Sequence, residues 1–405
     1  MPEIDPITQA VVCVDPVPGG WRWLLYKPLA GVPVLDRLLL TLQRAGIQRV
    51  ILWAPHLPPS HRRRVRERLR KDARLQMECT WLPPESPEDS PAGFPLAEDQ
   101  PCLVLAGHTV TTAGTLKKSF QMPAGRGPSA GGFCFEIQGA PAWRVLPGWN
   151  PDWQDPLRCG QRPPETRLTL EDGFFRTVRD GPSFRAAERA LLTHHKSHYT
   201  QLLDIHFNAH FSIPLSSMLV RLPVTPNQLT LFGLVIGAAA GYFFSRGDYL
   251  SGVLGGLLAA LTAVWDCCDG DVARLKFMES EFGETLDTFC DNLINIFIFS
   301  GLALGVAKTH GTAYALTPFL LLAAGGLAIF GLIYFPGGGK GNFFKQSPLY
   351  KTILLLASRN FIYVITLFAL LGRLDWFLWL AGAGALVFAG VLGWERRKLL
   401  AANSA

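Results

Sequence analysis

The sequence predicts an α-helical integral membrane domain with six transmembrane helices, preceded by an N-terminal cytoplasmic α/β domain. Two observations lead to this prediction. Residues 226–395 are dominated by Leu, Ala, Gly, Phe and Ile, and they contain repeated apolar windows of about 20 residues, the length at which a helix crosses a bilayer. Residues 1–200 instead carry scattered charges and prolines, and β-rich apolar runs alternate there with an amphipathic segment, a pattern typical of an α/β fold.

Six apolar windows predict the membrane-spanning helices. They lie near residues 228–245, 249–272, 285–307, 312–335, 351–371 and 375–394. If the N-terminal half is cytoplasmic, the inner loops and the C-terminus hold eight basic residues, namely Arg274, Lys276, Lys340, Lys345, Lys351, Arg396, Arg397 and Lys398. The outer loops hold three, namely Arg246, Lys308 and Arg373. This asymmetry predicts a multi-pass protein of the inner (cytoplasmic) membrane with both termini in the cytoplasm.

The overall composition excludes some classes of function. The net charge of +6 is small, and no long basic run with interleaved aromatic residues is present, so we expect no nucleic-acid partner. A mild positive excess instead suits a protein that lies against an anionic lipid leaflet. The eight cysteines show no spacing typical of metal ligands, and the N-terminus lacks the features of a signal peptide. We therefore expect reduced thiols and a lipid bilayer as the partner of the apolar half.

Within the N-terminal part, three apolar runs at 10–16, 49–55 and 101–108 predict strands of a parallel sheet, and residues 34–47 predict a helix on one face of it. Further along, residues 202–227 are amphipathic and too polar to span, which predicts a helix lying in the membrane interface. His206 and His210 are one helical turn apart in that segment, a spacing that suits either a metal ion or contacts with headgroups. These features divide the chain into 1–190, 191–225 and 226–398.

An acidic stretch, WDCCDGDVARLKFMESEFGETLDTFCDN (265–292), interrupts the apolar half. On a helix, Asp266, Asp269 and Ala273 share one face, and Gly283, Asp287 and Asp291 share one face of the next helix. A short turn between the helices brings four carboxylates together. Such a cluster is costly near a low-dielectric region unless cations bind it, and hard divalent ions such as Mg²⁺ or Mn²⁺ prefer oxygen ligands and also hold phosphates. The pattern predicts a metal-assisted phosphoryl-transfer site.

The same stretch resembles the CDP-alcohol phosphotransferase family. Its signature, D-x2-D-G-x2-A-R-x8-G-x3-D-x3-D, is matched by Asp266, Asp269, Gly270, Ala273, Arg274, Gly283, Asp287 and Asp291. The segment TPNQLT (225–230) is similar to the P-N-x-x-T entry to the first helix of the family, and the resemblance covers roughly residues 200–396. It implies transfer of a phospho-alcohol (or phosphatidyl) group from a CDP-alcohol donor to an acceptor hydroxyl, with release of CMP, by a homodimer.

Site residues follow from this resemblance position by position. It implies that Asp266, Asp269, Asp287 and Asp291 bind the metal and that Asp291 is also the general base. The residues expected to form the nucleotide pocket are Asn227, Gly270, Ala273, Arg274 and Gly283. Basic side chains that could hold the phosphate of an acceptor are Arg221, Lys340, Lys345 and Arg359. The acceptor stays open between a polyol phosphate and the head-group alcohol of a lipid.

Residues 26–55 resemble a nucleotidyltransferase domain of the sugar-phosphate type, with a Rossmann-like fold. In that family a Gly-rich loop follows the first strand and an Asp that binds metal follows a later strand. Here the loop DPVPGGWRW (15–23) lacks G-x-G-x-R, and His108 stands where the Asp is expected. We therefore interpret the domain as degenerate, as part of a fusion similar to inositol-phosphate cytidylyltransferase/di-inositol-phosphate phosphate synthases. Alternatives are a bifunctional enzyme that also makes the CDP-alcohol from CTP, and a non-catalytic membrane scaffold.

Overall fold

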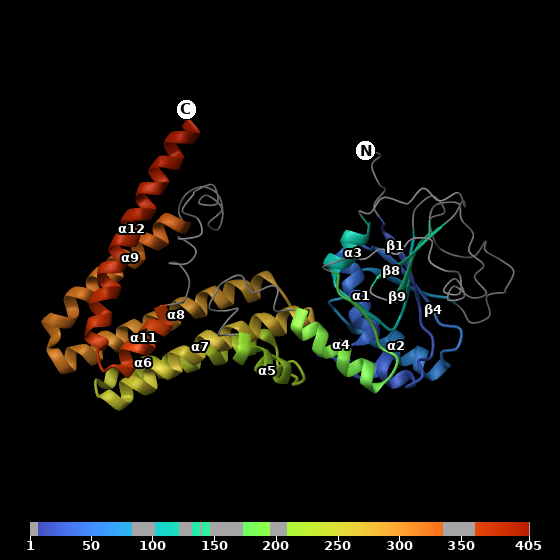
Figure 1. Ribbon diagram of the computed structural model, residues 1–405, viewed down its shortest axis with the longest axis horizontal. Coiled ribbons are helices and arrows are strands. Elements are labelled where there is room, and N and C mark those ends of the chain that lie inside the picture. The colour runs from blue at the N-terminus through green and yellow to red at the C-terminus, as the bar shows by residue number, and fades with distance from the viewer. Residues whose placement is uncertain are drawn as a thin grey trace. The chain divides into compact units, whose positions relative to one another are not determined.

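In the computed structural model the chain divides into two units (Figure 1). The first comprises Met1–Ser197 with two short pieces, Val220–Leu222 and Leu275–Phe277. The second comprises His198–Leu219, Pro223–Arg274 and Met278–Ala405. The residues that the structure describes are 7–82, 102–120, 132–137, 140–145, 173–194, 209–334 and 361–404.

A six-stranded sheet forms the centre of the first unit, in the order β5-β4-β1-β6-β9-β8. Its strands are β1 (Gln9–Cys13), β4 (Arg49–Trp53), β5 (Glu78–Trp81), β6 (Cys102–Ala106), β8 (Gly132–Ile137) and β9 (Ala140–Val145). The first four run parallel, and β9 pairs antiparallel with both β6 and β8. Every residue of β1 is buried between β4 and β6, which explains its apolar run from Ala10 to Cys13. The predicted parallel sheet and its three predicted strands are confirmed.

Helices cover this sheet in the expected βαβ manner (Figure 1). The remaining elements of the unit are η1 (Arg22–Tyr26), β2 (Pro28–Leu29), β3 (Val32–Pro33), α1 (Val34–Ala45), α2 (Pro59–Lys71), β7 (Thr109–Thr111), α3 (Ala113–Phe120), β10 (Phe175–Thr177) and α4 (Gly181–His194). Helix α1 corresponds to the predicted helix at 34–47 and ends at Gly46, whose φ of 106° ends the helix in the left-handed conformation. Its buried Arg37 donates hydrogen bonds to the carbonyl oxygens of Leu29 and Ala30, at 3.0 and 2.9 Å.

His108 lies directly after β6, at the edge of the sheet where the parallel strands β1 and β6 both end. The two strand ends are adjacent, because the backbone N–H of Gly107 donates to the carbonyl oxygen of Cys13 at 2.7 Å. In α/β proteins this edge carries the ligand site. Burial, with a smaller contribution from the charge of Arg179, lowers the pKa of His108 to about 4. The position expected to hold a metal-binding carboxylate in a nucleotidyltransferase therefore holds a largely buried neutral imidazole.

Acidification should destabilise the first unit through His108. The unfolded imidazole keeps a pKa near 6.5, so between about pH 6.5 and 4 the unfolded chain binds more protons than the folded one. The stabilisation is fully present above pH 6.5 and is lost as the pH falls towards 4. The full pKa shift corresponds to about 3 kcal/mol of stability.

Hydrogen exchange in β1 and β6 tests this prediction. After correction for intrinsic rates, we expect exchange to accelerate between pH 7.5 and 5.0 in the wild type and to accelerate much less in His108→Gln. The control is His56→Gln, at an exposed position. Equal acceleration in all three proteins would contradict the prediction.

The second unit consists of long apolar helices (Figure 1). They are α5 (Ala209–Leu219), α6 (Pro226–Arg246), α7 (Tyr249–Lys276), α8 (Glu281–His310), α9 (Thr312–Tyr334), α11 (Phe361–Leu370) and α12 (Leu374–Ser404). Among the described residues, five helical segments are long and apolar enough to cross a membrane: Pro226–Arg246, Tyr249–Lys276, Glu281–His310, Thr312–Leu332 and Leu374–Leu399. These agree with five of the six predicted spans. The predicted span at 351–371 overlaps α11, and its residues 351–360 lie outside the described residues.

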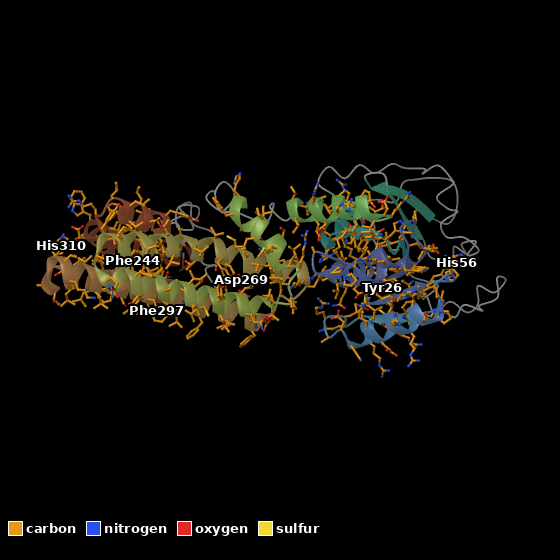
Figure 2. All side chains as sticks on the ribbon, turned by 90° about the horizontal axis from the view of Figure 1, so that it is seen from below. Tyr26, His56, Phe244, Asp269, Phe297 and His310 are labelled. Carbon is orange, nitrogen blue, oxygen red and sulfur yellow. The ribbon has the colours of Figure 1, made fainter. Side chains whose placement is uncertain are left out.

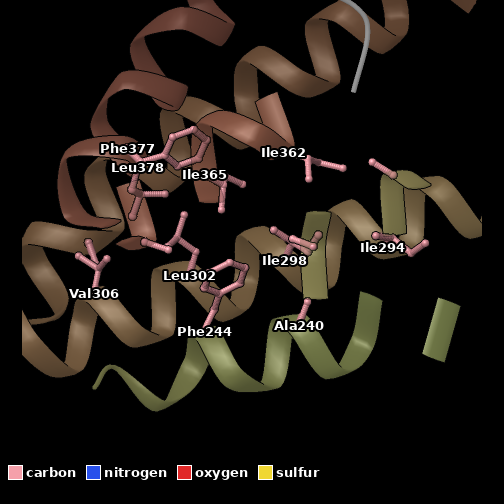
Figure 3. Close-up of a cluster of buried hydrophobic side chains, with 14 residues drawn as sticks. Ala240, Phe244, Ile294, Ile298, Leu302, Val306, Ile362, Ile365, Phe377 and Leu378 are labelled. Atoms are coloured by element: carbon pink, nitrogen blue, oxygen red, sulfur yellow. The ribbon is translucent and has the colours of Figure 1, made fainter. Parts of the chain in front are cut away.

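Helices α6 and α8 pack closely because glycines line their contact. A Cβ at Gly301 of α8 would overlap the carbonyl oxygen of Gly241 of α6. Small residues that let two backbones approach are typical of helix contacts in membranes. Beside this contact, Phe244 of α6 packs with Ile298 and Leu302 of α8 in a buried apolar cluster that also includes side chains of α11 and α12 (Figure 3). This cluster joins the long apolar helices of the second unit.

The predicted interfacial helix is represented by α5, which is shorter than the segment 202–227. Residues 202–208, including His206, lie outside the described residues, and the segment after Leu219 turns into α6, which begins at Pro226. Ser212 and Ser216 of α5 are fully buried, whereas His210 is exposed. One face of α5 is therefore buried in the second unit.

Candidate active site

The acidic stretch lies on two helices joined by a turn of four residues. Helix α7 continues to Lys276, and α8 starts at Glu281, where the N-cap Ser280 accepts a hydrogen bond from the backbone N–H of Gly283. The sequence predicts a turn of roughly LKFMESEF (275–282), so both helices extend further into this segment than expected. Asp266 and Asp269 are thus on the last turns of α7, and Asp287 and Asp291 are near the start of α8. Asp269 and His310 lie towards opposite ends of the helical unit (Figure 2).

Three carboxylates converge. Asp266, Asp269 and Asp287 each offer an oxygen atom, and these atoms all lie within 4.8 Å of one another. Asp269 is buried, and the other two are partly buried. Carboxylate oxygens at this separation are the ligands that Mg²⁺ and Mn²⁺ prefer, and a divalent cation would remove the repulsion between three like charges. The donor set therefore fits a hard divalent metal.

Asp291 lies one helical turn after Asp287 on α8, and it does not belong to the group whose oxygens lie within 4.8 Å. Its side chain is partly buried. The geometry thus separates three predicted metal ligands from the fourth, while the roles assigned to all four stay predictions. Because the family signature contains four Asp in one pattern, spacing alone did not distinguish them.

Helix α6 supports the acidic group from the side. Thr230 donates a hydrogen bond from Oγ1 to Oδ2 of Asp269 at 2.8 Å. One turn earlier, Thr225 caps the helix and forms a capping box with Gln228, which fixes where α6 begins. Thr230 was not predicted as a site residue, although it ends the motif P-N-x-x-T. Its hydrogen bond fixes the orientation of the Asp269 carboxylate, and a metal ligand needs such a fixed orientation to bind a cation well.

A cavity of about 560 Å³ opens beside the acidic group. Asp269 and Asp287 line it, and so do all five residues predicted to form the nucleotide pocket: Asn227, Gly270, Ala273, Arg274 and Gly283. A Cβ at Gly283 would lie 3.3 Å from Oδ1 of Asn227, so the glycine keeps the approach between α8 and α6 open. The structure therefore brings together the predicted nucleotide-binding residues and two of the predicted metal ligands.

Sequence reasoning missed the fifth Asp of the stretch. Asp271 is buried and accepts hydrogen bonds from Oγ of Ser216, at 3.0 Å, and from Nη2 of Arg274, at 2.9 Å. The i, i+3 spacing of Asp271 and Arg274 on one helix is a local signal that predicts such an ion pair. The contribution of Ser216 has no such signal, because it comes from another helix.

The predicted acceptor-binding residues are not gathered at the cavity in the described part of the chain. Arg221 belongs to the first unit, where its Nη2 forms an ion pair with Oε2 of Glu188 at 2.9 Å. Lys340, Lys345 and Arg359 lie outside the described residues. The acceptor-phosphate role of these four residues stays a prediction.

Residues 223–387 match the family model described as CDP-alcohol phosphatidyltransferase. The C-terminal half carries a CDP-alcohol phosphatidyltransferase domain. The matched range of this domain runs from just before α6 into α12 and includes the acidic group and the residues of the cavity. It confirms the resemblance that the signature predicted.

This CDP-alcohol phosphatidyltransferase domain is similar to parts of several curated proteins. An archaetidylinositol phosphate synthase of Pyrococcus horikoshii is 39% identical over 92 residues, which are 22% of this chain and 47% of that protein. A phosphatidylinositol phosphate synthase of Corynebacterium glutamicum is 34% identical over 105 residues, 25% of this chain and 46% of that protein. A bifunctional IPC transferase and DIPP synthase of Archaeoglobus fulgidus is 29% identical over 148 residues, 36% and 29% of the two chains. The chain spans less than half the length of each of these relatives.

Proposed function

We propose that this protein transfers a phospho-alcohol or phosphatidyl group from a CDP-alcohol to an acceptor hydroxyl and releases CMP. The observation that carries the proposal is the convergence of Asp266, Asp269 and Asp287 within 4.8 Å, beside a cavity of about 560 Å³ lined by the five predicted nucleotide-binding residues. A site for a divalent cation next to a nucleotide-sized cavity suits a substrate that contains a diphosphate.

Asp266, Asp269 and Asp287 would hold Mg²⁺ or Mn²⁺. Such a cation would neutralise the diphosphate and stabilise CMP as a leaving group. Thr230 keeps the Asp269 carboxylate oriented, and Gly270, Ala273 and Gly283 leave room for the flat cytosine and the backbone beside it. These residues bind and position the donor so that the phosphorus next to the alcohol faces the acceptor.

Asp291 is the proposed general base. The acceptor oxygen forms a bond to the phosphorus that carries the alcohol, the bond from that phosphorus to the oxygen of CMP breaks, and the hydroxyl proton passes to the Asp291 carboxylate. Its place one turn from Asp287 supports this role, because a base needs to reach the reacting hydroxyl while other carboxylates hold the donor.

The proposed acceptor is a phosphorylated polyol of the inositol phosphate type. Two relatives, named archaetidylinositol phosphate synthase and phosphatidylinositol phosphate synthase, support this choice over a non-phosphorylated head-group alcohol. The donor stays open between a CDP-linked lipid and a CDP-linked polyol, because the third relative is a bifunctional IPC transferase and DIPP synthase. The partly buried His108, where a metal-binding Asp is expected, and the loop without G-x-G-x-R favour a front domain that does not turn over CTP.

A donor and acceptor screen tests this function. The purified full-length protein is incubated with CDP-diacylglycerol or CDP-inositol, with inositol phosphate or inositol as acceptor, and with Mg²⁺ or Mn²⁺, and CMP release is measured. We expect CMP only when a CDP-alcohol, a divalent cation and the phosphorylated acceptor are all present. CTP with inositol phosphate should release no pyrophosphate, and pyrophosphate release would revive the bifunctional alternative. No CMP from any combination would contradict the proposal.

The proposed membrane topology has six spans, with the sixth completed by residues 351–371, and both termini in the cytoplasm of a bacterial-type inner membrane. Its support is the bias of eight basic residues to three between the two sides. We expect a phosphatase fused to the C-terminus to be inactive and a fluorescent protein at the same place to fluoresce. The reverse pattern, a periplasmic C-terminus, would contradict the topology. We also propose that the protein forms a homodimer. Chemical cross-linking in membranes should then give a product of twice the mass of one chain.

A further inference from the structure

Arg274 is held at the cavity by side chains outside the family signature. Its Nη2 donates to Oδ1 of Asp271 at 2.9 Å, and the other carboxylate oxygen of Asp271 accepts from Oγ of Ser216 at 3.0 Å. Arg274 lines the cavity, whereas Asp271 and Ser216 are not among the residues that line it. The three residues therefore form a chain that starts on α5, passes through α7 and ends at the nucleotide pocket.

The three hydrogen-bonded residues become more exposed from α5 towards the pocket, as expected if the inner two support the outer one. Ser216 is 1% exposed, the Asp271 side chain is 5% exposed, and the Arg274 side chain is 34% exposed. A buried carboxylate needs partners for its oxygens, and hydrogen bonds that include a charged group are stronger and more directional than neutral ones. Because both oxygens of Asp271 accept hydrogen bonds, its carboxylate has one orientation, and that orientation restricts the guanidinium of Arg274.

The guanidinium of Arg274 also lies close to Gly270. A Cβ at Gly270 would lie 3.2 Å from both Nη1 and Nη2 of Arg274, which is tighter than an ordinary contact. The glycine of the signature thus leaves space in which the guanidinium rests beside the wall of the cavity. A planar cation in this place suits a phosphate oxygen or the face of a base.

We propose that Asp271 and Ser216 are positioning residues that hold the Arg274 guanidinium for the cytidine nucleotide of the donor. This inference rests on the proposed CDP-alcohol transferase function and adds to it a role for α5. The helix contributes no atom to the cavity wall, but its Ser216 fixes the carboxylate that fixes Arg274. Loss of either support lets the guanidinium adopt other rotamers, which weakens donor binding more than it slows the chemical step.

Steady-state kinetics of the full-length protein in detergent tests the role. We expect Asp271→Asn to raise the donor KM by about 10-fold or more and Ser216→Ala to raise it by a smaller factor, since a hydrogen bond to a charged group is typically equivalent to about 10- to 100-fold in binding. The kcat and the acceptor KM should change by less than about 3-fold, a split that differs from the loss of active fraction caused by partial unfolding. The matched control is Ser217→Ala. It removes a neighbouring hydroxyl of α5 that donates a hydrogen bond to the carbonyl oxygen of Pro214 at 2.7 Å, and it should leave the donor KM unchanged.

A double substitution makes the dependence on Arg274 explicit. If Asp271 acts through Arg274, the combined Asp271→Asn and Arg274→Ala variant should have the donor KM of Arg274→Ala alone. Additive effects, or a fall in kcat with an unchanged donor KM, would overturn the inference while leaving the transferase function intact. Absence of CMP release from the wild type with every CDP-alcohol would overturn the function itself, and the inference with it. Should Asp271→Asn fail to fold, Ser216→Ala against Ser217→Ala decides the question.

Discussion

Replacing Asp266, Asp269 or Asp287 by Asn should reduce both donor binding and CMP release, the latter by about 100-fold or more. Each substitution removes one charge from the group whose oxygens lie within 4.8 Å of one another. Mutation of a residue that only orients a metal ligand typically reduces metal affinity or activity by about 10- to 100-fold. Mutation of a ligand itself should reduce them by at least this factor. The variants should stay folded, because losing one of several crowded negative charges relieves repulsion.

Asp291→Asn should behave differently from the other three. If Asp291 is mainly the base, the variant keeps metal-dependent binding of the CDP-alcohol while turnover falls by about 10²–10⁴-fold, the usual contribution of general-base catalysis. The position of Asp291 outside the close group of three carboxylates agrees with this separation of roles. The experiment is CDP-alcohol binding and CMP release, measured side by side with Mg²⁺ and with Mn²⁺.

Asp248→Asn, at the N-terminal end of α7, is a control substitution of the same type. Asp248 lies just before the first residue of that helix, where its Oδ1 accepts a hydrogen bond from the backbone N–H of Ser251 at 2.9 Å. Asn serves equally well at such a capping position, so Asp248→Asn should retain wild-type binding and turnover. Turnover like the wild type in Asp291→Asn would defeat its role as base. Activity that survives in Asp266→Asn and Asp287→Asn as well would defeat the proposed enzyme.

The second large effect is expected where α6 and α8 touch. A Leu at Gly301 would drive its side chain into the backbone of Gly241, and even the Cβ of an Ala there would overlap the carbonyl oxygen of that residue. Overpacking of this kind typically costs about 1–3 kcal/mol or more. Gly301→Ala should therefore lower the unfolding temperature by several degrees, and Gly301→Leu should prevent assembly of the helical unit. Activity should fall too, because Thr230 is on α6 and Asp287 is on α8.

Gly326→Ala on α9 is the control for this prediction, since in the described part of the chain a Cβ built there meets no atom within 4 Å outside its own helical turn. Ala is also the better helix former, so this variant should be as stable as the wild type or slightly more stable. Thermal unfolding in detergent can be followed with a thiol-reactive dye, because Cys268 of α7 and Cys290 of α8 are buried. Equal unfolding temperatures for Gly301→Ala and Gly326→Ala would show that the α6–α8 contact is not formed as described.

The features that the sequence predicts well are those that depend on neighbours along the chain. Apolar windows of sufficient length predicted the five described helices that are long and apolar enough to cross a membrane. β-rich apolar runs predicted the parallel strands β1, β4 and β6. The i, i+3 and i, i+4 spacing of Asp266, Asp269, Asp287 and Asp291 placed them on helix faces, because helical geometry converts local spacing directly into direction. The family resemblance also predicted five nucleotide-binding residues, and all five are among the residues that line the cavity.

Tertiary structure alone decided which of these faces meet, and in what register. The signature treats its four Asp alike, but the placement of the adjoining ends of α7 and α8 brings three of them together and leaves Asp291 one helical turn beyond Asp287. The bond from Ser216 to Asp271 joins residues 55 positions apart, and the bond from Thr230 to Asp269 joins residues 39 apart. Periodicity cannot encode such pairs, since it describes one helix at a time. Such pairs form only where two helices pack, and glycines such as Gly241 and Gly301, which let the backbones of α6 and α8 approach, help to set how closely helices of this unit pack.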